Sequence, residues 1–409
     1  MRATGIVAEF NPLHNGHVYC MEQARSITGA DALVVAMSGN FVQRGEPAIL
    51  DKWTRAGLAL ECGADLVVEI PALYCLGNAG QYADAGVRVL EALGKVDHLV
   101  FGSECGNTEL LTRIVEFFRE HAEQIEHEKS DLRDKRFSYP AATEKAYAAV
   151  REQYRTEGES DEDLERELKV LRSSNDILAL EYIASCRSAR PHAIRREGAL
   201  YSDPLDEKFK YQSATSLRAW ALDGRDISRY VPECTSKALS EIHITGPDTD
   251  KWHDALRYAV MMTASDDIED CPSGGEGLAN LMKSSVYDSY SWTKLARLVK
   301  SRRYTFTRIM RLCAQVLLGI RRAEFDEIQP GYIRVLGFND TGRKLLSEIR
   351  KDESNDLPVI TNISKSIRKL GDQERKLLEL DIHAADIYNL MTGRDMKKES
   401  EYVRNPVIL

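Results

Sequence analysis

Short apolar runs alternate with amphipathic stretches along the first hundred residues. The runs at residues 5–10, 32–37, 66–70 and 98–101 predict strands that are buried on both faces of a sheet. Between them, apolar residues recur every three or four positions at residues 17–28, 51–62 and 78–93, which predicts helices. Strands that alternate with helices predict an α/β fold, in which a parallel sheet is joined by right-handed crossovers.

The rest of the chain is mostly helical in pattern. Residues 151–169 carry charges of both signs and predict a solvated segment, and a helix with Ser174 or Asn175 as its cap follows. A further strand is expected within residues 190–201 and a capped helix at 213–222. Helices then dominate to about residue 328, after which strand–helix–strand returns at 331–338, 341–351 and 357–364, with an edge strand in 406–409. We therefore predict two domains, at residues 1–222 and 223–409.

Composition narrows the function classes. The net charge of −9 argues against general coating of nucleic acid but allows a local basic surface. No run approaches the roughly 20 apolar residues of a membrane span, and the apolar run at the N-terminus is too short for a signal peptide. The eight cysteines form no CxxC pair, which argues against a zinc site and a disulfide framework. We expect a cytoplasmic protein with no membrane partner and no metal held by protein ligands.

Two histidines follow the first predicted strand in "NPLHNGH". His14 and His17 lie where that strand turns into a helix, at the sheet edge where α/β proteins bind ligands. A helix N-terminus attracts phosphate, to which imidazoles can donate hydrogen bonds, and Gly16 leaves room for a flat ring. The residue types alone leave a second interpretation equally open, in which both histidines only cap or pack.

The position of HxGH directly after the first strand resembles the signature of the nucleotidyltransferase superfamily. Its members attack the α-phosphate of a nucleoside triphosphate and release pyrophosphate. The resemblance implies a Rossmann-like, parallel-sheet nucleotidyltransferase domain, followed here by a mostly helical α+β domain.

Further stretches resemble one family, the tRNA(Met) cytidine acetate ligases. These are "NPLHNGH", "GNFVQRGEPA", "DKWTRA", "GADLVVEIP", "FGSE", "SSNDILALEYI" and "IRREGALY". The resemblance is dense over residues 4–104 and looser over 170–220. It implies that acetate attacks ATP to give acetyl-adenylate and pyrophosphate. The acetyl group then passes to the wobble cytidine in the anticodon loop of elongator tRNA(Met) and forms N4-acetylcytidine. Adenylation suits this chemistry because it gives acetate a good leaving group, AMP, and the triphosphate is expected to carry Mg²⁺ held by phosphate and water.

The same resemblance implies the site residues. His14 and His17 would act on the phosphates as catalytic residues. The ATP-binding residues would be Val7, Ala8, Glu9, Phe10, Asn11, Pro12, Leu13, His14, Asn15, Gly16, His17, Val18, Tyr19, Cys20, Gly102, Asn175 and Arg196. Arg196 fits the family spacing better than Arg195, but the doubled arginine leaves both open. The chain departs from the family at Tyr201-Ser202-Asp203, where members usually carry Tyr-His-Asp.

Two further sets of polar residues are candidates. Ser213, Thr215 and Ser216 begin a predicted helix and resemble the superfamily's triphosphate contacts, although ordinary capping explains them as well. Asn40, Gln43, Arg44 and Lys52 follow the second strand and are candidate contacts to acetate or tRNA, or plain loop residues.

A basic stretch at residues 294–322 has nine Lys or Arg and no Asp or Glu. We expect a tRNA-binding surface there, and a basic face that answers an acidic neighbour is the alternative. The surface residues would be Lys294, Arg297, Lys300, Arg302, Arg303, Arg308 and Arg311. Two other functions remain open from the sequence: a small-molecule adenylyltransferase that releases pyrophosphate, and a nucleotide-binding RNA adaptor without catalysis.

Overall fold

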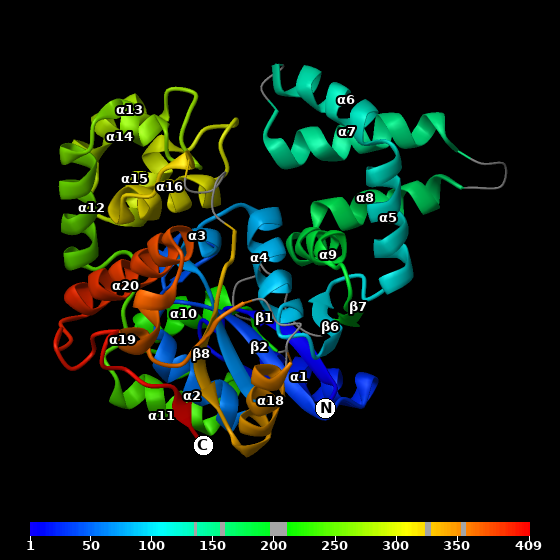
Figure 1. Ribbon diagram of the computed structural model, residues 1–409. Coiled ribbons are helices and arrows are strands. Elements are labelled where there is room, and N and C mark those ends of the chain that lie inside the picture. The colour runs from blue at the N-terminus through cyan, green and yellow to red at the C-terminus, as the bar shows by residue number, and fades with distance from the viewer. Residues whose placement is uncertain (135–136, 156–159, 197–210, 324–328, 353–356) are drawn as a thin grey trace.

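One sheet lies at the centre of the protein, between layers of helices (Figure 1). The structure is a computed structural model that describes residues 1–134, 137–155, 160–196, 211–323, 329–352 and 357–409. The strand order is β10-β8-β5-β2-β1-β6-β7, and β9 pairs with β8. The strands are β1 (Ala3–Ala8), β2 (Ala32–Ser38), β5 (Leu66–Ile70), β6 (Val96–Ser103), β7 (Arg190–Arg195), β8 (Ile333–Phe338), β9 (Val359–Ile360) and β10 (Val407–Ile408).

The pairing of the strands confirms the predicted α/β class. Strands β5, β2, β1, β6 and β7 all run parallel to one another. Strand β8 runs antiparallel to β5, so the sheet is mixed at one side. Parallel strands bring their carboxyl ends to one edge, which is where such sheets bind ligands.

Side chains alternate between the two faces of the sheet. On β2, Leu33, Val35 and Met37 pack with α1 (Asn15–Thr28) and α2 (Lys52–Glu61), while Val34 and Ala36 belong to the core that includes α4 (Ala79–Glu91). Every residue of β2 is buried. A strand without alternating polar residues is therefore covered on both faces, as its apolar run predicted.

Two groups of helices flank the sheet in Figure 1. The first is α5 (Thr108–Glu120), α6 (Ala122–Asp134), α7 (Tyr139–Gln153), α8 (Asp161–Arg172) and α9 (Ser174–Ser185). The second is α12 (Asp250–Met262), α13 (Ser265–Glu269), α14 (Leu278–Ser285), α15 (Trp292–Val299) and α16 (Phe306–Leu318). Trp252 joins this second group to the rest, because its ring meets Phe41 edge-on with centroids 5.7 Å apart.

Further helices, turns and a hairpin complete the fold. The helices are α3 (Ala72–Cys75), α10 (Ala214–Leu222), α11 (Glu233–Glu241), α18 (Asp340–Lys351), α19 (Ile363–Ser366) and α20 (Asp372–Thr392). The 3₁₀ turns are η1 (Ser228–Tyr230), η2 (Val286–Asp288) and η3 (Ile367–Lys369), and β3 (Phe41–Val42) pairs with β4 (Glu46–Pro47) as a small hairpin.

The C-terminal residues return to the first sheet. Strands β8 and β10 lie beside β5 at one side of it, which confirms the late strands predicted from the sequence. A division of the chain after residue 222 would take these strands out of the sheet. The two predicted domains therefore share one sheet, and the helices between residues 223 and 318 form an insertion into it.

Candidate active site

A cleft opens at the carboxyl ends of the parallel strands. Its lining comes from the end of β1, the start of α1, the β3–β4 loop, the end of β6 and the start of α10. The residues that line it are Ile6, Val7, Ala8, Glu9, Phe10, His14, Gly16, His17, Tyr19, Cys20, Gln43, Arg44, Tyr82, Phe101, Gly102, Asn175, Leu178, Tyr182, Ile194, Arg195, Arg196, Tyr211, Gln212, Ser213, Ala214, Thr215 and Arg218. Most of the predicted nucleotide contacts therefore converge on one cavity.

His14 and His17 cap the first turn of α1. The Nδ1 of His14 accepts a hydrogen bond from the backbone N–H of Gly16 at 3.1 Å, and the Nδ1 of His17 accepts one from the N–H of His14 at 3.2 Å. The two rings stack with centroids 3.7 Å apart. A Cβ at Gly16 would lie only 3.0 Å from the His14 ring, so glycine provides the space for that ring. Capping and ligand binding, which the sequence left as alternatives, can thus coexist.

The caps fix the protonation of both rings. Because each Nδ1 accepts a hydrogen bond, the proton of a neutral imidazole lies on Nε2. Burial and, to a smaller extent, the charge of Arg196 lower the pKa of His17 to about 3. Burial also lowers the pKa of His14 well below its usual value, with His17 and Arg196 acting in the same direction. The pair therefore offers two neutral N–H donors at a helix N-terminus, a suitable arrangement for phosphoryl oxygens.

The loop before the histidines is held from several sides. Phe10 has a φ of 49°, a left-handed conformation that is costly for a bulky residue and that the surroundings must enforce. The side chain of Asn11 accepts the N–H of Ile49 at 2.8 Å, and its carbonyl accepts Arg218 Nη1 at 2.7 Å. Of the predicted nucleotide loop, Asn11, Pro12, Leu13, Asn15 and Val18 do not line the cleft. Asn11 and Leu13 are buried and support the loop instead.

Gly102 and Arg196 meet at the ends of β6 and β7. A Cβ at Gly102 would lie 3.2 Å from the Arg196 side chain, so the glycine lets the arginine pass across the strand. The charge of Arg196 reaches His14, His17 and Cys20, whose pKa values it lowers, whereas Arg195 affects none of them. Both arginines line the cleft, and Arg196 is the one whose charge acts on the two histidines. The remainder of "IRREGALY", with Tyr201-Ser202-Asp203, lies outside the described residues.

Asn175 lines the cleft from α9. Its Nδ2 donates to Glu104 Oε1 at 2.5 Å, which links α9 to the "FGSE" turn. The predicted cap of this helix is wrong: Ser173, rather than Ser174 or Asn175, accepts the N–H of Asp176. The side chain of Asn175 is therefore not needed for capping.

The N-terminus of α10 also points at the cleft. Ser213 caps it by accepting the N–H of Ser216 at 3.2 Å, and Ser213 and Thr215 line the cleft. Ser216 is not among the lining residues, because its hydroxyl lies 2.6 Å from that of Ser213 and completes the cap. The ordinary capping interpretation holds for Ser216, while Ser213 and Thr215 remain candidates for phosphate contact.

The four polar residues after β2 separate into two pairs. Gln43 and Arg44 line the cleft from the β3–β4 loop. Asn40 and Lys52 do not: Asn40 is 5% exposed and its side chain accepts the backbone N–H of Lys52 at 2.8 Å. The structure therefore corrects the expectation that these two contact acetate or tRNA.

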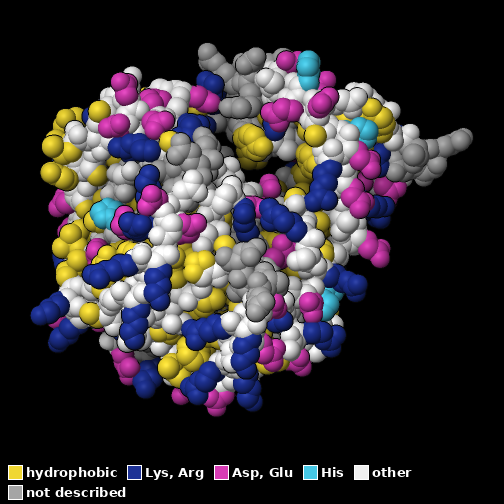
Figure 2. All heavy atoms as spheres, in the orientation of Figure 1, with side chains coloured by type: hydrophobic (Ala, Val, Ile, Leu, Met, Phe, Trp, Pro, Cys, Tyr) yellow, Lys and Arg dark blue, Asp and Glu magenta, His cyan; other side chains and the backbone are white. Residues whose placement is uncertain are grey.

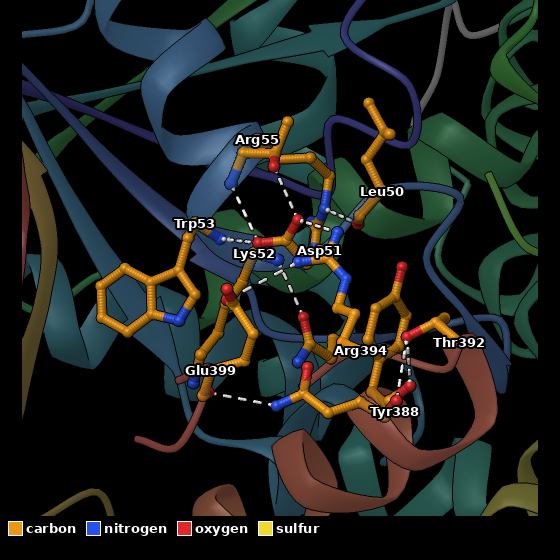
Figure 3. Close-up of polar contacts among 12 residues, drawn as sticks. Leu50, Asp51, Lys52, Trp53, Arg55, Tyr388, Thr392, Arg394 and Glu399 are labelled. Atoms are coloured by element: carbon orange, nitrogen blue, oxygen red, sulfur yellow. Dashed lines mark hydrogen bonds and ion pairs between the residues drawn. The ribbon is translucent and has the colours of Figure 1, made fainter. Parts of the chain in front are cut away.

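Lys52 belongs to a buried ion cluster that joins α2 to the C-terminal region (Figure 3). Its Nζ lies 2.8 Å from Glu69 and 3.1 Å from Glu401, and the residue is 1% exposed. Beside it, Arg394 pairs with Asp51 at 2.6 Å. Burial alone would lower the pKa of Lys52, but Glu401 and Glu69 raise it above its usual value. The role of Lys52 here is structural.

Several cleft residues were not predicted from the sequence. Tyr82, Tyr182, Tyr211, Gln212 and Arg218 all line it. Arg218 could have been predicted as a site residue, since it ends the "SATSLR" stretch. In the structure it pairs with Glu46 at 2.6 Å. The two buried tyrosines lie on helices whose apolar pattern explains them as core residues, so nothing in the sequence marked them.

The predicted basic surface lies on α15, α16 and the turn between them. Arg297, Lys300 and Arg302 are exposed. Arg303 pairs with Glu276 at 2.8 Å, and Arg308 donates to the carbonyls of Ser273 and Gly274. Figure 2 shows Lys and Arg side chains over much of one face, with Asp and Glu between them. Three residues of the predicted set are thus exposed to solvent, whereas Arg303 and Arg308 bind residues of the same helical group.

Arg311 connects this surface to the cleft. Burial, together with the nearby charges of Arg308 and Arg44, lowers its pKa to about 10. Its backbone lies against Gly45, where a Cβ would be only 2.2 Å from the Arg311 nitrogen. The basic segment therefore reaches the β3–β4 loop, one residue from the cleft-lining Arg44.

The described residues show neither a metal cluster nor a membrane-spanning helix. Within them, no group of three or more His, Cys, Asp or Glu could hold a metal ion. In the same part of the chain, no helix has the length and apolar character to cross a membrane.

Comparison with known proteins gives a consistent result. The HIGH Nucleotidyl Transferase family model matches residues 1–402. A tRNA(Met) cytidine acetate ligase of Clostridium novyi is 33% identical over 421 residues and covers 100% of both chains, and one of Thermoanaerobacter is 36% identical over 95% of each. Crystal structures of Thermotoga maritima TmcAL, apo and bound with alpha-thio ATP, have TM-scores of 0.90 and 0.88 at 30% identity, covering 100% of each chain.

Proposed function

Because the chain belongs to the tRNA(Met) cytidine acetate ligase family, within the HIGH nucleotidyl transferases, we propose that it activates acetate with ATP and acetylates tRNA(Met). The first product is acetyl-adenylate, with release of pyrophosphate. The acetyl group then moves to the wobble cytidine in the anticodon loop of the elongator tRNA, and the product is N4-acetylcytidine.

The stacked histidines carry this proposal. Their two Nε2–H groups bind phosphoryl oxygens of ATP and stabilise the charge that develops when acetate attacks the α-phosphate. Arg196 and the N-terminus of α10, with Ser213 and Thr215, bind the rest of the triphosphate, and Gly102 contacts the nucleotide. Two N–H donors and a helix N-terminus fit a polyanion well, because all of them offer N–H groups to its oxygens.

Mg²⁺ accompanies the triphosphate. No cluster of carboxylates among the described residues suits the ion, so phosphate oxygens and water would hold it, and it would neutralise negative charge on the triphosphate. Gln43 and Arg44 serve the acetate or the tRNA, since they line the cleft from the β3–β4 loop.

The tRNA reaches the cleft along the basic segment. Arg297, Lys300 and Arg302 contact its phosphates, and Arg311 and Arg44 continue the positive charge toward the cleft. The target cytidine must leave the anticodon stack to enter the cavity. Residues 223–409 thus carry the tRNA surface, and residues 1–222 carry the nucleotide site.

Pyrophosphate exchange tests the first step. ATP–pyrophosphate exchange should require acetate, and labelled acetate should appear in elongator tRNA(Met) only when ATP is present. His17→Ala should abolish both. Exchange that proceeds equally without acetate would instead identify a different adenylyl acceptor.

A further inference from the structure

Acetyl transfer to an amine leaves one proton to remove. The cytidine N4 nitrogen attacks the carbonyl carbon of acetyl-adenylate, a C–N bond forms, and the C–O bond to the phosphate breaks. AMP departs with that electron pair. The nitrogen then carries one hydrogen too many, and a group in the cleft must accept it as the bond forms.

Most cleft residues are poor proton acceptors. Each histidine keeps its proton on Nε2 because Nδ1 is bound to a backbone N–H. Burial raises the pKa of Tyr82 and Tyr182 well above the usual value, and raises that of Cys20 to about 11, so all three remain protonated. Among the described residues that line the cleft, Glu9 is the one carboxylate.

Glu9 is held in place by two other elements. The backbone N–H of Gln43 donates to its Oε1 at 3.0 Å, and Arg55 Nη1 donates to its carbonyl at 2.6 Å. No described residue donates a hydrogen bond to its Oε2. The carboxylate therefore keeps one oxygen outside these bonds. It lies directly after the end of β1, beside the β3–β4 loop that carries Gln43 and Arg44, and it lines the cleft.

We propose that Glu9 is the catalytic base that accepts the N4 proton during acetyl transfer. This assignment rests on the proposed function. It places the role of Glu9 in the transfer of the acetyl group rather than in the binding of ATP. The charged and titratable groups that face Glu9 are Arg44 and Glu46 of the β3–β4 hairpin, Arg218 of α10, Arg55 of α2, Tyr82 of α4 and Tyr182 of α9. Burial raises the pKa of Glu9, and Arg44 and Arg218 oppose that shift.

The two half-reactions can be measured separately. Acetate-dependent ATP–pyrophosphate exchange reports adenylation, and single-turnover transfer from synthetic acetyl-adenylate to a tRNA(Met) transcript reports acetylation. Glu9→Gln keeps the shape of the side chain and an oxygen for the Gln43 N–H. The ratio of transfer to exchange should fall by about 10²-fold or more, the usual contribution of a general base. Glu46→Gln is the matched control, since it removes a neighbouring carboxylate outside the cleft lining, and it should leave the ratio unaltered.

A pH profile gives a second readout. Transfer by the wild type should rise with pH as Glu9 loses its proton and then level off, while Glu9→Gln lacks this rise. Glu9→Asp keeps a carboxylate and should recover part of the transfer activity. Its pH profile should still rise with pH, and this tests the assignment even if the glutamine variant does not fold. Equal losses in both half-reactions, or unaltered transfer, would overturn the assignment. Absence of acetate-dependent exchange in the wild type would overturn the proposed function instead.

Discussion

The rings of His14 and His17 lie face to face, 3.7 Å between centroids, while both Nδ1 atoms accept backbone N–H groups. The stack thus builds the helix N-terminus and presents its Nε2 atoms to the cleft with the same two side chains. Substitutions can separate these roles, because some residues cap helices without offering an equivalent donor.

His17→Gln should preserve folding and lose catalysis. Glutamine at this position can still accept the His14 N–H in a capping box, but its amide does not replace the Nε2–H. We expect a loss of roughly 10²- to 10³-fold in the adenylation rate, typical of removing one donor to developing charge. His17→Ala, which also removes the cap, should lose about 1 kcal/mol of stability in addition. Urea unfolding and pyrophosphate exchange measure the two effects, and equal stability of both variants would contradict the capping role.

The low pKa of His17 should make stability depend on pH. In the folded protein it titrates at about 3, below its unfolded value of 6.5, so the unfolded chain binds more protons between these values. Stability should therefore fall as pH drops below 6.5, by at most about 1.4 kcal/mol per pH unit from this group. The wild type should lose more stability than His17→Gln between pH 7 and pH 5 in urea titrations. Identical pH dependence of the two proteins would contradict the prediction.

Arg196 and Arg195 should differ in their effect on ATP. Arg196→Ala removes the charge that acts on both histidines and should raise the KM for ATP by roughly 10- to 100-fold, as for a charge-assisted contact. Arg195→Ala is the control and should change the KM far less. A larger effect of Arg195→Ala in steady-state kinetics would reverse the assignment.

Lys52→Ala should act on stability alone. Removing it leaves Glu69 and Glu401 buried without their cation, at a cost of about 3–5 kcal/mol. The KM for ATP, measured at a temperature where the variant stays folded, should match that of the wild type. Lys344→Ala, on an exposed face of α18, should change stability by less than about 0.5 kcal/mol. A Lys52→Ala variant that is as stable as the wild type but impaired in tRNA acetylation would instead show that Lys52 acts in the active site.

The basic surface should show itself in salt dependence. A variant with alanine at Arg297, Lys300 and Arg302 should weaken tRNA binding and flatten the slope of log affinity against log salt by roughly 0.7 to 0.9 per lost phosphate contact. Pyrophosphate exchange needs no tRNA and should be unaffected. Alanine at Lys344, Lys351 and Lys397, which are also exposed, serves as the charge-matched control. An equal effect of both triple variants on tRNA binding would show only a dependence on net charge.

Local sequence patterns predicted the strands of the sheet well, and most residues of the predicted nucleotide loop line the cleft. An apolar run such as that of β2 requires burial on both faces of the strand. His14 and His17 are only three residues apart in the sequence, and their rings stack in the structure. The position of Lys52 could not be predicted this way. Its partner Glu401 is more than three hundred residues away, so the sequence near Lys52 resembled a polar loop at the site rather than an interior ion cluster. Tyr82 and Tyr182 were missed because apolar periodicity describes a buried tyrosine and a cleft tyrosine alike.

The ion cluster around α2 has a consequence for the order in which the protein is made. Tyr388 and Arg394 bond to Ala48 and Asp51, 340 and 343 residues earlier in the chain. Contacts of such sequence separation close late and slowly during folding. Arg55, which donates to the carbonyl of Glu9, lies on α2. The C-terminal contacts that hold the start of α2 can therefore form only after nearly the whole chain has left the ribosome. A nascent chain that already contains both histidines should still lack a working cleft.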